Sequence, residues 1–372
     1  MVHAEVIKVY KNACSFIEQK QLIEAFNQLE ILLDNLQWGE AVEKKEELQQ
    51  IYRYMLSFTF EGVKDPEQET IYTNLVTSLY KLLEEVKEEL LLRNSSYYEY
   101  SQKRYFLYGN KPDIKEIRKG IEESFANAGL SELLEESFQL KGKSEEYFLQ
   151  REKLISQLFR LIWFSNHFTT EEKDTFLAIT NSSIISVEDK CVTVSALFLS
   201  LLRNFDEDKI LMLTDLCKHP EVKVAQRALV AIFPLCSLYA NRLIYFSSIH
   251  HRLLLLFDDH KILEKLFTVI IQFIRSCETD KITKKLHEEI LPEVMKVSPL
   301  LQEKMDIDSL LRGEDTEEKN PEWQEILEES GLSEKLKEFS ELQMEGADVY
   351  MSTFAMLKNF PFFNDAKNWF SP

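Results

Sequence analysis

DEDKILMLTDLCKHPEVKVAQRALVAIFPLCSLY, residues 206–239, has the pattern of two antiparallel helices joined by a tight corner. Apolar residues recur at the i, i+3, i+4, i+7 spacing with which a helix buries one stripe of its surface. The two stripes are Ile210, Leu213, Leu216 and Cys217, then Val222, Ala225, Leu229, Ile232, Phe233 and Cys236. At the corner, His219-Pro220-Glu221, Pro220 suits a first helical position because it lacks an N–H and has a fixed φ. One such pair cannot bury its own apolar face, so it needs neighbours of the same build.

The same pattern returns on either side of this stretch. A shift of 35 residues superimposes four apolar pairs: Val187 on Val222, Leu197 on Ile232, Phe198 on Phe233 and Leu201 on Cys236. A third copy, HHRLLLLFDDHKILEKLFTVIIQFI at residues 250–274, aligns when a few extra residues are allowed. This period is typical of stacked helix pairs, and it predicts an all-α chain built as an α-solenoid of stacked antiparallel helix pairs.

Composition agrees with an all-helical chain. Only 9 glycines and 9 prolines occur in 372 residues, against an average usage of roughly 7% and 5%. The net charge is −19, which argues against a nucleic-acid partner. The acidity is concentrated in residues 301–350, where 16 Asp and Glu face 5 Lys and Arg.

The five cysteines, Cys14, Cys191, Cys217, Cys236 and Cys277, are scattered through apolar helical patterns. We expect buried free thiols in a reducing compartment. The first residues lack a basic start, a long apolar run and a small-residue cleavage site, so no signal peptide is predicted. The longest apolar run, near residues 266–274, is shorter than the ~20 residues of a spanning helix. A cytoplasmic protein without membrane contact is expected.

Four regions are predicted along the chain: an N-terminal helical region at residues 1–143, helical repeats at 144–304, an acidic linker at 305–320 and a helical C-terminal module at 321–372. Within the first region, residues 93–109 are expected to be an aromatic connector. Two helices are expected at residues 113–126 and 131–140, with Gly129 as the stop between them. Thr169 and Glu172 have the spacing of a capping box at the start of a helix.

Several segments resemble known helical-repeat families. IEQKQLIEAFNQLEILL, residues 17–33, resembles a tetratricopeptide-type helix pair, and HPEVKVA at residues 219–225 with the following Ala228-Leu229 resembles HEAT and armadillo repeats. The second resemblance covers roughly residues 165–278. Residues 60–72, 217–232 and 320–370 are also similar to a tetratricopeptide family of Bacteroidota proteins, in which a block like 320–370 lies mid-chain. This resemblance implies a HEAT-like or TPR-like helical-repeat architecture and a longer parent chain, but no activity.

No residue pattern for chemistry is present. His250, His251 and His260 form the densest histidine cluster, but adjacent histidines point to different helix faces and no HExxH or CxxC accompanies them. A nucleophile elbow and a glycine-rich phosphate loop are both missing from the sequence. The acid pairs Glu84-Glu85, Glu88-Glu89 and Glu135-Glu136 are interpreted as solvated helix faces. We therefore expect no catalytic, cofactor-binding or metal-binding residue.

The C-terminal tail is the candidate binding surface. Five of its aromatics are assigned to partner binding: Phe360, Phe362, Phe363, Trp369 and Phe370. Phe354 lies just before them. Such a cluster needs a covering surface. That cover is the helix expected at residues 334–358, a continuation of the chain past residue 372, or a separate partner.

The function predicted from these features is a non-catalytic scaffold whose stacked helices present an extended face to a protein or peptide. One alternative is that the chain is the helical-repeat part of a longer regulatory or enzymatic protein whose active part lies outside these residues. Another is a binder of peptidoglycan, glycan or lipid, which the missing export signal disfavours. The sequence leaves the partner's identity and the oligomeric state open.

Overall fold

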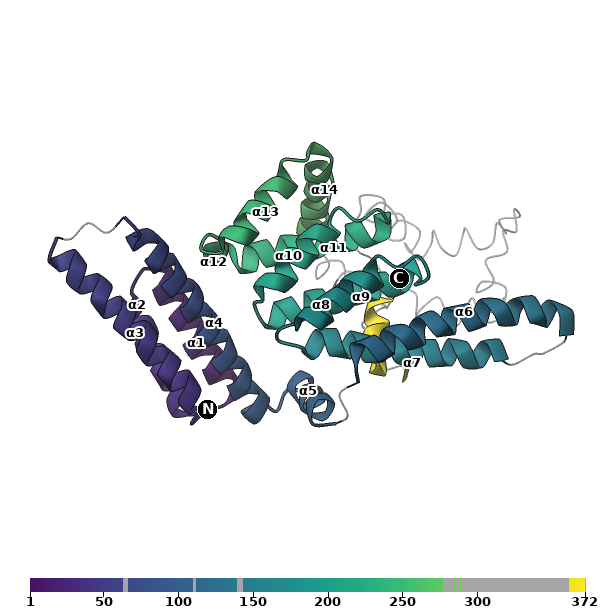
Figure 1. The fold of residues 1–372 in the computed structure, drawn as a ribbon, viewed down its shortest axis with the longest axis horizontal. Helices are drawn as coiled ribbons and strands as arrows, with labels where there is room; N and C mark the ends of the chain where they lie inside the picture. The colour runs from purple at the N-terminus through teal and green to yellow at the C-terminus, as the bar shows by residue number, and fades with distance from the viewer. Residues whose placement is uncertain are drawn as a thin grey trace. The chain divides into compact units, whose positions relative to one another are not determined.

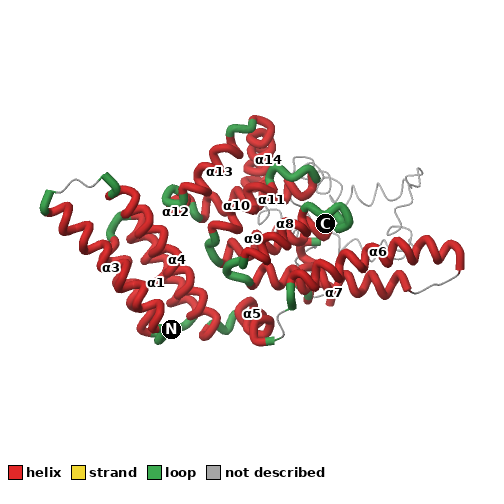
Figure 2. The backbone as a smooth tube through the Cα atoms, viewed as in Figure 1, coloured by secondary structure: helices red, strands yellow, loops and turns green. Residues whose placement is uncertain are grey.

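The computed structural model describes residues 1–62, 66–109, 112–138, 143–276 and 361–371, besides positions 284 and 288; of residues 128–138 and 143–145 it describes only the backbone. Within these ranges the chain is all-α, with 14 α-helices and no strand (Figures 1 and 2). The helices are α1 (His3–Glu18), α2 (Leu22–Asp34), α3 (Gly39–Phe60), α4 (Gln68–Asn94), α5 (Tyr98–Tyr108), α6 (Ile114–Phe138), α7 (Lys143–Phe164), α8 (Thr170–Thr180), α9 (Val187–Arg203), α10 (Glu207–Leu216), α11 (Val222–Leu238), α12 (Ala240–Leu243), α13 (Ser247–Phe257) and α14 (His260–Ser276). Two 3-10 helices follow, η2 (Pro361–Asn364) and η3 (Ala366–Phe370).

The chain forms two compact units. One contains Met1–Leu263 together with Trp369–Pro372, and the other contains Glu264–Asn368. In the second unit the described residues are mainly the larger part of α14 and the 3-10 turns before Trp369. The predicted acidic linker at residues 305–320 lies outside the described residues.

The first four helices form a packed group, with α1 against α2 and α4, and α3 against α4 (Figure 1). The predicted stripe of the second helix is confirmed, because its apolar side chains are all buried: Leu22, Ala25, Phe26, Leu29, Leu32, Leu33 and Leu36. Helix α4 is buried over most of its circumference from Leu75 to Leu91. An amphipathic surface helix would bury only one stripe, so α4 is an internal helix of this unit.

Helices α8–α11 and α13 are consistent with a helical repeat. Helices α9 and α11 begin 35 residues apart and pack together, and α10 packs against α13. Polar contacts recur at nearly the same sequence separation: Lys223 Nζ to Glu188 Oε1 at 3.1 Å, Arg252 Nη1 to Asp215 Oδ1 at 2.6 Å, and Tyr239 Oη to the Leu201 carbonyl at 2.6 Å. Equivalent positions of successive helix pairs therefore face each other, as the 35-residue shift predicts.

Side-chain caps define several helix starts. The capping box is confirmed: the Glu172 amide donates to Thr169 Oγ1 at 3.1 Å, and the Thr169 amide donates to the Glu172 carboxylate at 2.9 Å. Ser186 and Asp206 cap α9 and α10 in a similar way. Pro220, in contrast, precedes α11, whose N-cap is Glu221. The ring of His219 makes this corner by accepting from the Glu221 amide at 3.0 Å while its other nitrogen lies 3.0 Å from the Thr180 carbonyl.

Two expectations for the N-terminal region were wrong. Residues 98–108, expected to be a connector, form helix α5, whose Tyr100 and Lys103 are buried. Helix α6 continues through Gly129, where a stop was expected. A glycine inside a helix costs only about 1 kcal/mol, and α6 packs along α7, so this packing outweighs the local preference.

The stripe of α11 is confirmed only in part. Ala225, Ala228, Leu229 and Ile232 are buried, Phe233 and Cys236 are half-buried, and Val222 is 59% exposed. Val222 is the first residue of the helix, so no preceding turn covers it. Among the four described cysteines, all free, Cys191 and Cys217 are buried while Cys14 and Cys236 are half-buried.

The stability lost when a side chain of α11 is truncated should depend on how deeply that side chain is buried. Ile232→Ala is expected to lower the free energy of unfolding by about 2–5 kcal/mol, because it leaves a cavity in the core. Val222→Ala in the same helix should change it by less than about 0.5 kcal/mol, since an exposed side chain loses little packing. Urea unfolding of both variants measures the difference. Equal losses would show that the buried face of α11 is misassigned.

Candidate functional site

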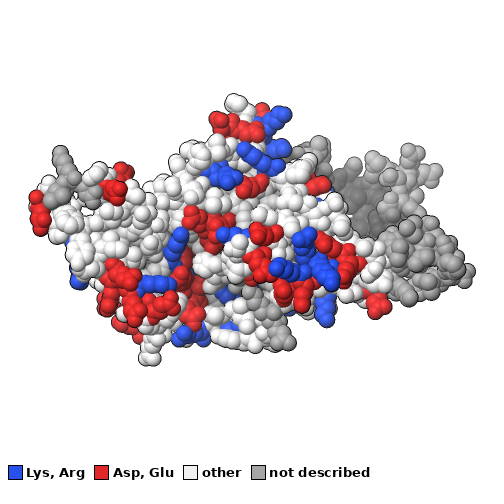
Figure 3. Space-filling view, in the orientation of Figure 1, with Lys and Arg blue, Asp and Glu red and all other residues white. Residues whose placement is uncertain are grey.

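The residues considered from sequence for metal binding do not converge. His250, His251 and His260 are all exposed, and within the described ranges no three His, Cys, Asp or Glu side chains are arranged to hold a metal ion. None of the described helices is both long and apolar enough to cross a membrane. On the face drawn in Figure 3, Lys and Arg side chains lie among Asp and Glu rather than in one continuous patch.

The interpretation of the α4 glutamates as a solvated face was wrong. Glu84 and Glu88 are each 1% exposed, whereas Glu85 and Glu89 are partly exposed. A buried carboxylate must be paired and hydrogen-bonded to be tolerated. Both glutamates meet this requirement through basic residues from helices far away in sequence.

Glu88 is surrounded by three basic side chains and a tyrosine. Its Oε2 accepts from Lys103 Nζ of α5 at 2.8 Å and from Arg203 of α9, while Oε1 accepts from Tyr100 Oη at 3.0 Å. Lys87 Nζ lies 3.7 Å from the same carboxylate. Burial alone would raise the pKa of Glu88, but Arg203, Lys87 and Lys103 together lower it to about 2. Glu88 is therefore a fixed negative charge.

Glu84 makes a second centre one turn earlier on α4. It accepts from Lys87 Nζ at 2.5 Å, from Arg242 Nη1 of α12 at 2.5 Å and from the Tyr10 hydroxyl of α1. The Arg242 guanidinium also lies over the Tyr80 ring, 4.4 Å from its centroid. We name these two centres and their cations the α4 charge network, comprising Glu84, Lys87, Glu88, Lys103, Arg203 and Arg242. Because each of its four cations contacts one of the two buried carboxylates, we interpret the network as a device that positions helices.

Lys209 is a further buried cation, next to this network. Its side chain is fully buried, and Nζ donates to the Ser165 carbonyl at 2.6 Å and to Ser200 Oγ at 2.8 Å. Burial lowers the pKa of Lys209 to about 7, although Asp206 opposes the shift. The ammonium lies 4.4 Å from the centroid of the Phe168 ring, which encloses it further.

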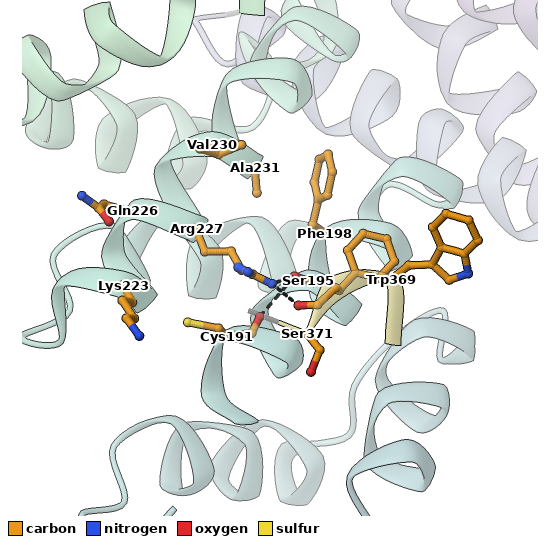
Figure 4. A pocket seen from close by; sticks show the side chains of 11 residues that line it. Cys191, Ser195, Phe198, Lys223, Gln226, Arg227, Val230, Ala231, Trp369 and Ser371 are labelled. Carbon is orange, nitrogen blue, oxygen red and sulfur yellow. Dashed lines mark hydrogen bonds between the residues drawn. The ribbon is translucent and has the colours of Figure 1, made fainter. Parts of the chain in front are cut away.

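A pocket of about 520 Å³ lies along α9 and α11. We name it the α9–α11 pocket. Its lining residues are Cys191, Ser195, Phe198, Lys223, Gln226, Arg227, Val230, Ala231, Trp369, Phe370 and Ser371 (Figure 4). The last three come from the C-terminal tail, so part of this face of the repeat is already covered by a segment of the same chain.

Phe370 of the tail makes two contacts at the α9–α11 pocket. The Phe370 ring stacks on the Phe159 ring of α7, with centroids 5.9 Å apart and planes at 28°. Arg227 Nη1 donates to the Phe370 carbonyl at 2.5 Å and to Ser195 Oγ at 3.0 Å. Figure 4 shows Lys223 and Gln226 at the opposite side of the pocket from Trp369. Both the ring contact and the main-chain contact are made by Phe370.

The five predicted partner-binding aromatics fall into separate places. Phe360 lies outside the described residues. Phe362 is 58% exposed, and its ring meets that of half-buried Phe363 at 5.1 Å between centroids. Trp369 and Phe370 lie in the α9–α11 pocket. Sequence analysis missed Arg227, for which the only signal is a cation on the second helix of a repeat, and the α4 charge network.

Comparisons with known proteins add no identification. No protein-family model matches the chain, and neither a curated protein nor a solved structure is significantly similar to it.

Glu88→Gln should destabilise the fold strongly. Removing the charge leaves the surrounding cations buried without their partner, a change that costs about 3–5 kcal/mol. Glu89→Gln is the matched control: its partner Arg93 is half-exposed, and such pairs contribute about 0–1 kcal/mol. Urea unfolding at neutral pH compares the two variants. Equal unfolding midpoints would contradict the structural role assigned to Glu88.

Lys209 should make stability depend on pH. Since its pKa falls from 10.5 to about 7 on folding, the unfolded chain binds more protons than the folded chain between these values. Stability should therefore rise with pH across this window, by at most about 1.4 kcal/mol per pH unit for one proton. Lys209→Met should reduce this rise, and Lys261→Met, which removes an exposed lysine, should keep it. Parallel profiles for wild type and Lys209→Met between about pH 7 and pH 10 would contradict the prediction.

Proposed function

We propose that this protein is a non-catalytic helical-repeat scaffold, an α-solenoid of HEAT-like and TPR-like helix pairs, that binds a protein or peptide partner in the α9–α11 pocket. Helix pairs that contact each other at nearly the same sequence separation, 35 to 38 residues, support the repeat architecture. Stacked pairs of this kind create continuous surfaces suited to peptide recognition.

The observation that carries the proposal is the tail segment Trp369–Ser371 in the pocket. It supports the proposal because a short segment of the chain lines the pocket and its main chain accepts a hydrogen bond from Arg227. The pocket presents apolar side chains, Phe198, Val230 and Ala231, beside a cation that recognises the main chain, Arg227. An apolar centre with a few placed polar groups is the usual composition of a binding pocket.

The same composition favours binding over catalysis. Cys191, the pocket residue that could act as a nucleophile, is buried, and burial raises its pKa. A thiol in that state is inert, because the thiolate is the nucleophile. Lys223 Nζ is paired with Glu188 at 3.1 Å. These side chains are suited to binding a ligand without reacting with it.

A peptide supplied in trans tests the proposal. A fluorescent peptide of residues 361–372 is titrated into the full chain carrying Phe370→Ala, which weakens the chain's own tail. We expect saturable binding in fluorescence anisotropy. Adding Val230→Arg places a bulky cation in the pocket and should weaken binding at least about tenfold, ~1.4 kcal/mol. Leu238→Arg is the control, since Leu238 is similarly exposed on α11 but does not line the pocket. Equal affinities for both arginine variants, or no binding, would contradict the proposal.

A further inference from the structure

Arg227 differs from Arg203 and Arg242, two arginines that hold this unit together. Arg203 and Arg242 each contact a buried carboxylate, Glu88 and Glu84. The Arg227 guanidinium donates only to neutral oxygens, Ser195 Oγ and the Phe370 carbonyl, and no carboxylate of the described residues lies within 4.0 Å of it. The α9–α11 pocket therefore contains a half-buried positive charge without a counter-ion.

The two contacts of Phe370 restrict where a counter-ion could lie. Both the ring stacked on Phe159 and the carbonyl bound by Arg227 belong to Phe370. A carboxylate that replaced this carbonyl would have to belong to the same residue as the ring. Only a C-terminal aromatic residue meets this condition, because its α-carboxylate takes the place of the peptide carbonyl.

We propose that the α9–α11 pocket is a site for the C-terminal aromatic residue of a partner protein, with its α-carboxylate paired to Arg227. The inference rests on the proposed binding function and specifies its ligand. The chain's own residues Trp369–Ser371, which are uncharged, then occupy the place where the C-terminal residue of the partner would bind. They supply the aromatic ring but leave the cation without its anion.

The physical chemistry favours the terminal carboxylate over the internal carbonyl. Hydrogen bonds between arginine and a carboxylate are charge-assisted, commonly bidentate and about twice as strong as neutral ones. Ser195 Oγ accepts a hydrogen bond from the Arg227 guanidinium, so this side chain is already partly ordered and loses less conformational entropy when a ligand binds. Lys223 lines the same pocket, but its ammonium is already paired with Glu188 at 3.1 Å, so Arg227 is the pocket cation assigned to the carboxylate.

The test compares two peptides that differ in one group. Acetyl-Lys-Asn-Trp-Phe, the sequence of residues 367–370, is prepared with a free carboxylate and with a C-terminal amide. Each is titrated by calorimetry into the full chain carrying Phe370→Ala. We expect the free acid to bind at least about tenfold more tightly than the amide, and the difference to shrink as salt is added.

Variants of Arg227 assign the difference to this residue. Arg227→Gln should make the two peptides bind equally, and Arg227→Lys should restore part of the preference for the acid. Lys223→Gln, which removes a neighbouring cation from the same pocket, should leave the preference largely intact. Circular dichroism of each variant establishes that it is folded.

The outcomes separate this inference from the proposed function. Equal affinity of the acid and the amide for the chain with Arg227 would overturn the carboxylate site while leaving peptide binding in place. A preference for the acid that survives Arg227→Gln would also overturn it, because the anion would then be bound elsewhere. Failure of both peptides to bind would overturn the inference together with the proposed function.

Discussion

Two carboxylates buried on one face of α4 impose the arrangement of the first compact unit. Glu84 and Glu88 lie one turn apart, and neither could remain charged in the interior without opposite charges around it. Those charges come from Lys87 of α4 itself and from α5, α9 and α12, so these three helices are held against α4 at fixed positions. Buried ion pairs contribute less to stability than their Coulomb attraction suggests, because desolvation opposes them. Their effect here is to raise the free energy of any other packing of these helices, because such a packing would leave a buried charge without an opposite charge beside it.

The α4 charge network also bears on the α9–α11 pocket. Arg203 is the last residue of α9, where a cation is favoured by the helix dipole, and Glu88 fixes it there. The same helix carries Cys191, Ser195 and Phe198 of the pocket wall. Lys209 adds to this constraint by joining α10 to Ser200 of α9 and to the Ser165 carbonyl after α7. The pocket thus lies on a helix whose C-terminal half is held by charged groups, which suits a site that must keep its shape.

The sequence predicted what depends on local pattern. The all-α class, the buried stripe of α2, the 35-residue spacing of α9 and α11 and the Thr169 cap all follow from periodicity and capping within a few residues. The sequence did not predict contacts between residues that lie far apart along the chain. Glu88 and Arg203 are 115 residues apart, and Glu84 and Arg242 are 158 apart, so an acid pair on a helix resembled an ordinary solvated face. The formation of α5 rather than a connector also depends on tertiary contacts, because Lys103 of α5 is buried between Glu88 and Asn166.

The sequence predicted the aromatic tail of the candidate site but not the residues that the tail contacts, because those contacts are also made between distant parts of the chain. An aromatic tail signals from sequence that it needs a covering surface, but not which rings are covered or by what. The decisive feature, the missing counter-ion of Arg227, is a property of three-dimensional neighbours. Arg203 and Arg242, to which we assign a structural role, are buried and matched with a carboxylate. Arg227 lies half-buried at a pocket and is matched only with neutral oxygens. The same kind of side chain is therefore used in two ways, and the charge of Arg227, at a pocket and without a carboxylate, remains available to a ligand.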